Sequence, residues 1–157
     1  MGLLAAHLND AGIVVVNDER ILYWEPGFAL LEDDHIVTGI EAFRNASLKP
    51  RRIQNRYWSS LSTSSLTDQR FHHMSNADLV SSQLEHMWKK VAAPTDQLAI
   101  AVPAYMSNEN LALLLGIAAE LGIEIVAMSD AAVSATRRRY EHAVPVHIDL
   151  GLHCSML

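Results

Sequence analysis

The pattern of hydrophobic and polar positions changes halfway along the chain. The first half consists of short β-branched and apolar runs separated by turn residues. Such runs predict strands joined by tight turns, at 12–16, 20–24, 29–31 and 35–37, arranged as an antiparallel β-meander. Weak helical character follows at 39–49, with Ile40, Phe43 and Leu48 expected to face inward before Pro50 ends the element. Residues 51–75 show no regular pattern.

The second half alternates helix and strand. Apolar residues at a spacing of three to four predict helices over 76–91 and 109–121, the first capped by Ser75 or Asn76 and the second by Ser107 or Asn108. Strands are predicted at 97–102, 123–127 and 144–149, with a further helix from Asp130 to about Tyr140. Connections this short imply right-handed parallel crossovers.

Together these elements predict an α/β fold. It consists of a mixed five-stranded sheet, an antiparallel meander followed by parallel strands, with helices on both faces. Because the meander runs outward from the first predicted strand, Ile13–Val16 is expected at the centre of the sheet, beside Leu98–Val102.

Composition narrows the class of protein. The chain has 157 residues, of which 50% are hydrophobic and 19% charged, which suits one folded domain and excludes global disorder. A net charge of −6 opposes general nucleic-acid binding. A single cysteine excludes an internal disulfide framework, and no apolar run approaches the roughly 20 residues of a membrane span. We expect a cytoplasmic domain with no nucleic-acid or membrane partner.

Other candidate chemistry is sparse. The eight histidines show no metal-ligand spacing, and the adjacent His72 and His73 would point apart. Cys154 has no local base that would make it a nucleophile. Arg51 and Arg52 carry either solvated surface charge or a contact to phosphate or carboxylate.

Short strings, in order along nearly the whole chain, resemble motifs of the actin, sugar-kinase and heat-shock chaperone superfamily. Residues 101–106 (AVPAYM) are similar to V-P-A-Y-F, and 128–135 (MSDAAVSA) resemble N-E-P-T-A-A-A-L-A. Residues 147–151 (HIDLG) resemble the second phosphate motif, D-L-G-G-G-T, and 8–12 (LNDAG) stand where the first, D-L-G-T-T, is expected. Residues 37–42 (VTGIEA) resemble V-G-x-x-A. The strings are most like the heat-shock chaperone (DnaK-like) branch.

The resemblance implies the first lobe of an actin-like, ribonuclease-H-like ATPase fold, which binds ATP with Mg²⁺ between two lobes. It also implies roles for seven residues. These are Asp10 and Asp149 as catalytic residues that hold magnesium through water, Gly12, Arg56 and Gly151 as phosphate contacts, and Pro103 and Asp130 as a relay of the nucleotide state. From the residues alone, Asp10 and Asp149 are equally turn residues, Arg56 a surface or packing residue, and Asp130 a helix N-cap.

Both phosphate motifs depart from the family pattern. Ile13 and Val14 stand at the threonine positions of the first motif, while Leu152 and His153 replace glycines of the second. We therefore expect residues 1–143 to form a first lobe and 144–157 the first strand of a second lobe that is missing. Such a chain would be a nucleotide-binding lobe that is catalytically incompetent in isolation.

Two alternatives to this function stay open. The chain is a non-catalytic interaction or scaffold module with a protein partner or client, or an unrelated α/β binding domain. The terminal strand, lacking a neighbour, is expected to form a homodimer, or else to fold back onto the first lobe.

Overall fold

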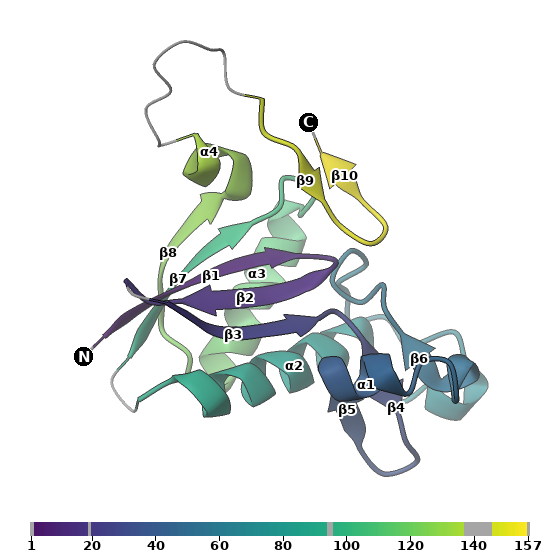
Figure 1. Ribbon diagram of the computed structural model, residues 1–157. Coiled ribbons are helices and arrows are strands. Elements are labelled where there is room, and N and C mark those ends of the chain that lie inside the picture. The colour runs from purple at the N-terminus through teal and green to yellow at the C-terminus, as the bar shows by residue number, and fades with distance from the viewer. Residues whose placement is uncertain (1, 19, 94–95, 137–145, 157) are drawn as a thin grey trace.

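Strand β1 (Leu3–Asn9) is the central strand of a five-stranded sheet in the computed structural model, which describes residues 2–18, 20–93, 96–136 and 146–156. The strand order is β3-β2-β1-β7-β8 (Figure 1). Strands β2 (Gly12–Val16) and β3 (Ile21–Pro26) add antiparallel on one side. Strands β7 (Gln97–Val102) and β8 (Ile125–Asp130) add parallel on the other. The predicted α/β class and mixed five-stranded sheet are confirmed.

The predicted centre of the sheet is wrong. Strand β1 lies between Ile13–Val16 and Leu98–Val102, and it pairs with both β2 and β7. Its alternation is clear in the structure, because Leu4, Ala6 and Leu8 are buried while Leu3 and Ala5 are exposed. Alanine occupies two of these positions, Ala5 and Ala6, so the alternation of apolar and polar residues that predicts a strand is weak in the sequence.

A second, three-stranded sheet holds the strands that were expected to continue the meander. Its order is β5-β4-β6, formed by β4 (Ala29–Leu31), β5 (Ile36–Thr38) and β6 (Ile53–Gln54). Helix α1 (Ile40–Arg44) packs beside it (Figure 1). The inward orientation predicted for Phe43 and Leu48 is wrong: they are 51% and 78% exposed, and Ala42 is the buried residue of the helix.

Helices α2 (Asn76–Val91) and α3 (Asn108–Glu120) cover one face of the main sheet. Each begins with a capping box, formed by Ser75 with Asp78 and by Ser107 with Asn110. Their buried residues join those of β1 and β7 in one hydrophobic core: Leu79, Val80, Leu84, Met87, Leu114, Ile117 and Ala118. The short α4 (Ala131–Ala135) borders a hollow on the opposite face, about 660 Å³ in volume and lined mostly by alanine and valine.

Residues 51–75 contain little regular structure, as predicted: besides β6 they include 3-10 turns at Pro50–Arg52, which begins one residue earlier, and at Gln69–Phe71. They are nevertheless anchored. The Tyr57 hydroxyl and the Trp58 ring nitrogen both donate to Gln83 Oε1 at 2.7 Å, inside the core.

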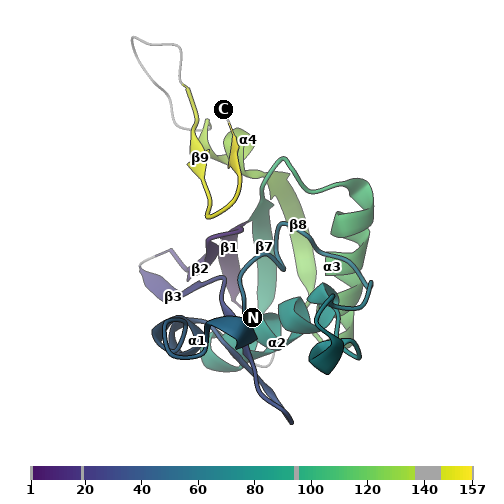
Figure 2. The same ribbon diagram turned by 90° about the vertical axis from the view of Figure 1, so that its right-hand side faces the viewer.

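The chain ends in a short hairpin of β9 (Asp149–Leu150) and β10 (Ser155–Met156). In both views it lies beyond the carboxyl end of β1 (Figures 1 and 2). The predicted strand at 144–149 is wrong for 146–148, which are not strand, while 144 and 145 fall outside the described residues. Helix α4 ends at Ala135, and the rest of its predicted length, from 137, also falls outside them. None of the helices described has the length and apolar character to cross a membrane.

Candidate functional site

Two turns that are far apart in the sequence meet at the carboxyl end of β1. The first turn, Asp10–Ala11, joins β1 to β2, and the terminal turn, Gly151–Cys154, joins β9 to β10. The Asp10 carboxylate is fully buried and accepts three backbone N–H groups of the terminal turn. Leu152 donates to Oδ1 at 2.8 Å, and His153 and Cys154 donate to Oδ2 at 2.6 and 3.1 Å.

Local side-chain bonds shape both turns. Asn9 Oδ1 accepts the Ala11 N–H at 2.9 Å, which is the geometry of an Asx turn. The amide nitrogen of the same side chain donates to Asp149 Oδ1 at 3.0 Å, which ties the two turns together. The terminal turn is closed by the Gly151 N–H, which donates to the Cys154 carbonyl at 2.8 Å.

The two glycines of the site are required for different reasons. A Cβ on Gly151 would lie 1.6 Å from Asp10 Oδ1, so this glycine lets the terminal turn approach the carboxylate. Gly12 has φ +146°, and a Cβ there would lie 2.2 Å from the Glu25 carbonyl. Gly12 therefore serves the packing of β2 against β3.

A tyrosine that sequence reasoning did not select belongs to this site. The Tyr105 hydroxyl is buried and has no hydrogen-bond partner among the described residues. Burial, followed by the negative charge of Asp10, raises the pKa of Tyr105. The sequence signal was present, because Tyr105 follows the carboxyl end of β7, where polar groups of an α/β sheet gather.

The structure brings together four of the seven predicted site residues: Asp10, Gly12, Asp149 and Gly151. Arg56 lies close by, because the carbonyl of its neighbour Asn55 accepts a hydrogen bond from His153 Nε2 at 3.1 Å. The Arg56 side chain is exposed and has no partner among the described residues.

Pro103 and Asp130, the predicted relay pair, border a separate hollow of about 320 Å³ at the ends of β7 and β8. The Asp130 carboxylate accepts the Ala132 and Val133 N–H groups at 2.8 and 3.2 Å. The N-cap interpretation of Asp130 is therefore confirmed.

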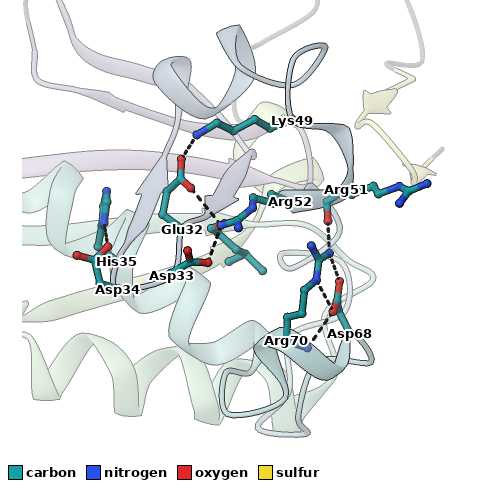
Figure 3. Close-up of polar contacts among 10 residues, drawn as sticks. Glu32, Asp33, Asp34, His35, Lys49, Arg51, Arg52, Asp68 and Arg70 are labelled. Carbon is teal, nitrogen blue, oxygen red and sulfur yellow. Dashed lines mark hydrogen bonds and ion pairs between the residues drawn. The ribbon is translucent and has the colours of Figure 1, made fainter.

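The arginine pair belongs to another cluster, around the small sheet (Figure 3). Arg52 donates to Glu32 at 3.2 Å and to Asp33 at 2.9 Å, and Lys49 also pairs with Glu32. Of the two alternatives for Arg52, the contact to carboxylate is the one observed. Both carboxylates belong to this chain and not to a ligand.

We tested whether this arrangement fits a nucleotide with its magnesium ion. Three converging N–H groups form a cradle suited to an oxyanion. Their donors, however, are already bonded to Asp10, and the Asp149 carboxylate accepts from Asn9. No group of three histidine, cysteine or acidic side chains within the described residues is arranged to hold a metal. The nucleotide and its ion do not fit these turns while Asp10 stays in place.

Comparison with known proteins defines the class of fold. No family model matches the sequence, and no curated protein matches it. Solved structures do match: the chain has the fold of one lobe of the actin-like ATPases.

Two proteins illustrate the match. MreB5 of Spiroplasma citri bound to ADP aligns with a TM-score of 0.60 and 15% identity, over 82% of this chain and 37% of that one. A non-polymerising mutant of MamK bound to AMPPNP aligns with a TM-score of 0.57 and 22% identity, over 81% of this chain and 40% of that one. The chain thus spans about two fifths of the length of the structures that it matches.

Proposed function

We propose that this chain is the N-terminal nucleotide-binding lobe of an actin-like protein and that it is catalytically incompetent as an isolated chain. One observation carries the proposal: the first turn and the terminal turn meet at the carboxyl end of the central strand, with three N–H groups aimed at a carboxylate. The matched MreB5 and MamK structures were solved with ADP and AMPPNP bound, which supports a nucleotide as the ligand class.

In this proposal the two turns bind the phosphate groups of the nucleotide but do not catalyse its hydrolysis. The backbone of Gly151–Cys154 supplies donors for a phosphate oxygen, and Arg56 supplies a nearby positive charge. Asp10 and Asp149 keep the family's magnesium role only in a form of the lobe where their present hydrogen bonds are broken. Pro103 and Asp130 line the hollow at the ends of β7 and β8. In this proposal the two residues transmit a change in the nucleotide-binding turns to a partner protein bound there.

Titration of the 157-residue chain with Mg-ATP tests the proposal. Calorimetry should give a dissociation constant above about 1 mM, since only one lobe and two eroded motifs are present. Amide spectra at millimolar ATP should show shifts confined to the first turn, the terminal turn and Tyr105, and adenosine should leave them unchanged. Micromolar binding would contradict the weak binding expected of a single lobe with altered phosphate motifs, and unshifted turns would contradict the proposed nucleotide role.

A non-catalytic interaction module is the second candidate. It is favoured by the same carboxylates, since both are already bonded to protein donors. This candidate predicts no response of the turns to ATP at any concentration.

Further features of the sequence interpretation remain proposals. Assignment to the heat-shock chaperone branch rests on the sequence strings alone, and the division at 143/144 falls outside the described residues. A protein partner or client and a cytoplasmic location are also still predictions.

The homodimer through the C-terminal strand would use the apolar residues Val146, Ile148 and Leu150, which are exposed. Strand β9, however, finds its pairing partner β10 within its own chain. Sedimentation of the full chain beside Ile148→Ser should show a dimer that the substitution dissociates. Monomers in both samples would exclude this interface.

A further inference from the structure

We infer that Asp10 is an internal anion that caps the terminal turn and competes with any phosphate oxyanion for its N–H groups. That the competing ligand is a phosphate rests on the proposed function. That Asp10 caps the terminal turn rests on the hydrogen-bond geometry alone. In the capped lobe the turn most suited to bind phosphate is occupied by the protein's own carboxylate.

The cradle is built from three consecutive residues. The N–H groups of Leu152, His153 and Cys154 converge on one carboxylate at 2.6 to 3.1 Å and engage both of its oxygens. Successive N–H groups that converge in this way form an anion-binding nest, and hydrogen bonds to an ionised acceptor are among the stronger ones in proteins. The partners are 142 to 144 residues apart, so tertiary structure and not a local turn places Asp10 there.

The Asp10 carboxylate takes its hydrogen bonds from these donors. It is fully buried, and its hydrogen-bond partners among the described residues are the three backbone N–H groups of the terminal turn. A buried carboxylate without partners is costly, so the terminal turn and Asp10 stabilise each other. The nearby Tyr105 hydroxyl has no hydrogen-bond partner among the described residues, so it does not donate to Asp10. The three N–H groups are therefore the hydrogen-bond donors described for the Asp10 carboxylate.

Asp10 and a phosphate oxygen cannot bind the terminal turn at the same time, for steric as well as electrostatic reasons. A Cβ on Gly151 would lie 1.6 Å from Asp10 Oδ1, so the carboxylate fills the contact surface of the turn. A phosphate oxygen would need the same donors and would repel Asp10 at contact distance. Binding therefore requires Asp10 to move out of the cradle.

Amide hydrogen exchange tests the cap without any ligand. In Asp10→Ala, the Leu152, His153 and Cys154 amides should exchange at least about tenfold faster than in the unmodified chain. The matched control is Asp18→Ala, which removes an exposed carboxylate from the β2–β3 turn and should leave these three rates unchanged. Asp10→Asn preserves side-chain size and should also accelerate exchange, which covers the case in which the alanine variant does not fold.

Inorganic pyrophosphate tests the competition. Asp10→Ala should bind it at least about tenfold more tightly than the unmodified chain, with slow exchange restored at the three amides. Asp18→Ala, with the same change in net charge, should bind it no better than the unmodified chain. Equal exchange rates, or equal pyrophosphate affinities, in the unmodified chain and Asp10→Ala would overturn the inference.

The results of these two Asp10 tests can be distinguished from the result of the nucleotide titration. Pyrophosphate carries no nucleoside, so a chain that passes both Asp10 tests but shows no ATP-induced shifts keeps the cap and loses the proposed nucleotide role. ATP-induced shifts together with Asp10-independent exchange would remove the cap alone.

Discussion

Two buried carboxylates, Asp10 and Glu25, are stabilised in opposite ways. Asp10 is 0% exposed and is balanced by three backbone N–H groups from the terminal turn. Glu25, on β3, is 5% exposed and is balanced by the Lys90 ammonium of α2, with the His86 ring beside it. Lys90 Nζ lies 2.8 Å and His86 Nε2 3.6 Å from Glu25 Oε1, and the Ile40 N–H donates to Oε2 at 3.3 Å.

The difference shows what each carboxylate holds together. Glu25 joins β3, the start of α1 and the second half of α2, so it fastens the small sheet to the main lobe. Asp10 fastens only the terminal hairpin, the last element of the chain. We therefore expect changes around Glu25 to alter global stability and changes around Asp10 to act locally.

The largest expected effect comes from Gly39→Ala. Gly39 has φ +76°, and a Cβ there would lie 1.4 Å from Glu25 Oε2. The substitution adds backbone strain and displaces a buried charge, so unfolding free energy should fall by about 3 kcal/mol or more. Gly122→Ala is the control, because its φ is +70° but nothing lies within 4 Å of the added Cβ. Urea denaturation should show a loss of about 1 kcal/mol for Gly122→Ala. Equal losses would mean that Glu25 does not constrain this position.

The next effect is that of Lys90→Met, which removes the closest cation of Glu25. The Lys90 side chain is 50% exposed, so water screens part of the interaction and we expect a loss of about 1–2 kcal/mol. Lys89→Met breaks the Lys89–Glu85 pair one position away, whose lysine is 71% exposed, and should cost only about 0.3 kcal/mol. Thermal denaturation of both variants measures the difference. A Lys90 variant as stable as the Lys89 variant would show that Glu25 does not depend on its cation.

Gly151→Ala should act on the terminal hairpin alone. Its Cβ would displace the turn from Asp10, and because the carboxylate is then hydrated, the main lobe should lose less than about 0.5 kcal/mol. Exchange of the Leu152–Cys154 amides should accelerate, while β1 and β7 amides remain protected. Gly116→Ala, in α3 with nothing within 4 Å of its Cβ, should leave the terminal amides unaffected. Global unfolding caused by Gly151→Ala would refute the local role of the cap.

The smallest effect concerns Asp68, a partly exposed carboxylate. Side-chain hydrogen bonds from Arg70 lower the pKa of Asp68 from 3.8 to about 2 (Figure 3). Because the folded-state pKa lies below the unfolded one, this pairing favours the fold above pH 3.8 and is lost as pH falls toward 2. Carboxyl NMR titration of Arg70→Ala should show a raised Asp68 pKa. In Arg51→Ala it should not move, since only the Arg51 carbonyl contacts Arg70.

The sequence predicted elements whose signals are local. Ser75 and Ser107 mark the starts of α2 and α3, and the apolar stripe of α2 ends at Val91 as expected. Strand β1 was missed because alanines weaken its alternation. The separation of the small sheet was missed because strand pairing depends on contacts between distant residues.

The sequence predicted most residues of the candidate site, with Tyr105 the exception, but it did not predict the hydrogen bonds between them. Asp10, Asp149 and Gly151 were identified from motif resemblance, and the structure brings them together. The capture of Asp10 by the terminal turn joins positions more than 140 residues apart, which no local pattern encodes. Glu25 went unnoticed for a related reason, since its partners come from two other elements, α1 and α2.

The central position of β1 has a consequence for folding during synthesis. This strand leaves the ribosome well before its parallel partner β7, because Leu3 pairs with Gln97, 94 positions later in the sequence. The β1–β2–β3 meander can form early, because its turns are local, but one edge of β1 stays unpaired until Val102 has emerged. Parallel pairing over such a separation is slow, and unpaired edges promote aggregation. We therefore expect nascent chains that end before β7 to associate readily with chaperones that bind exposed strands.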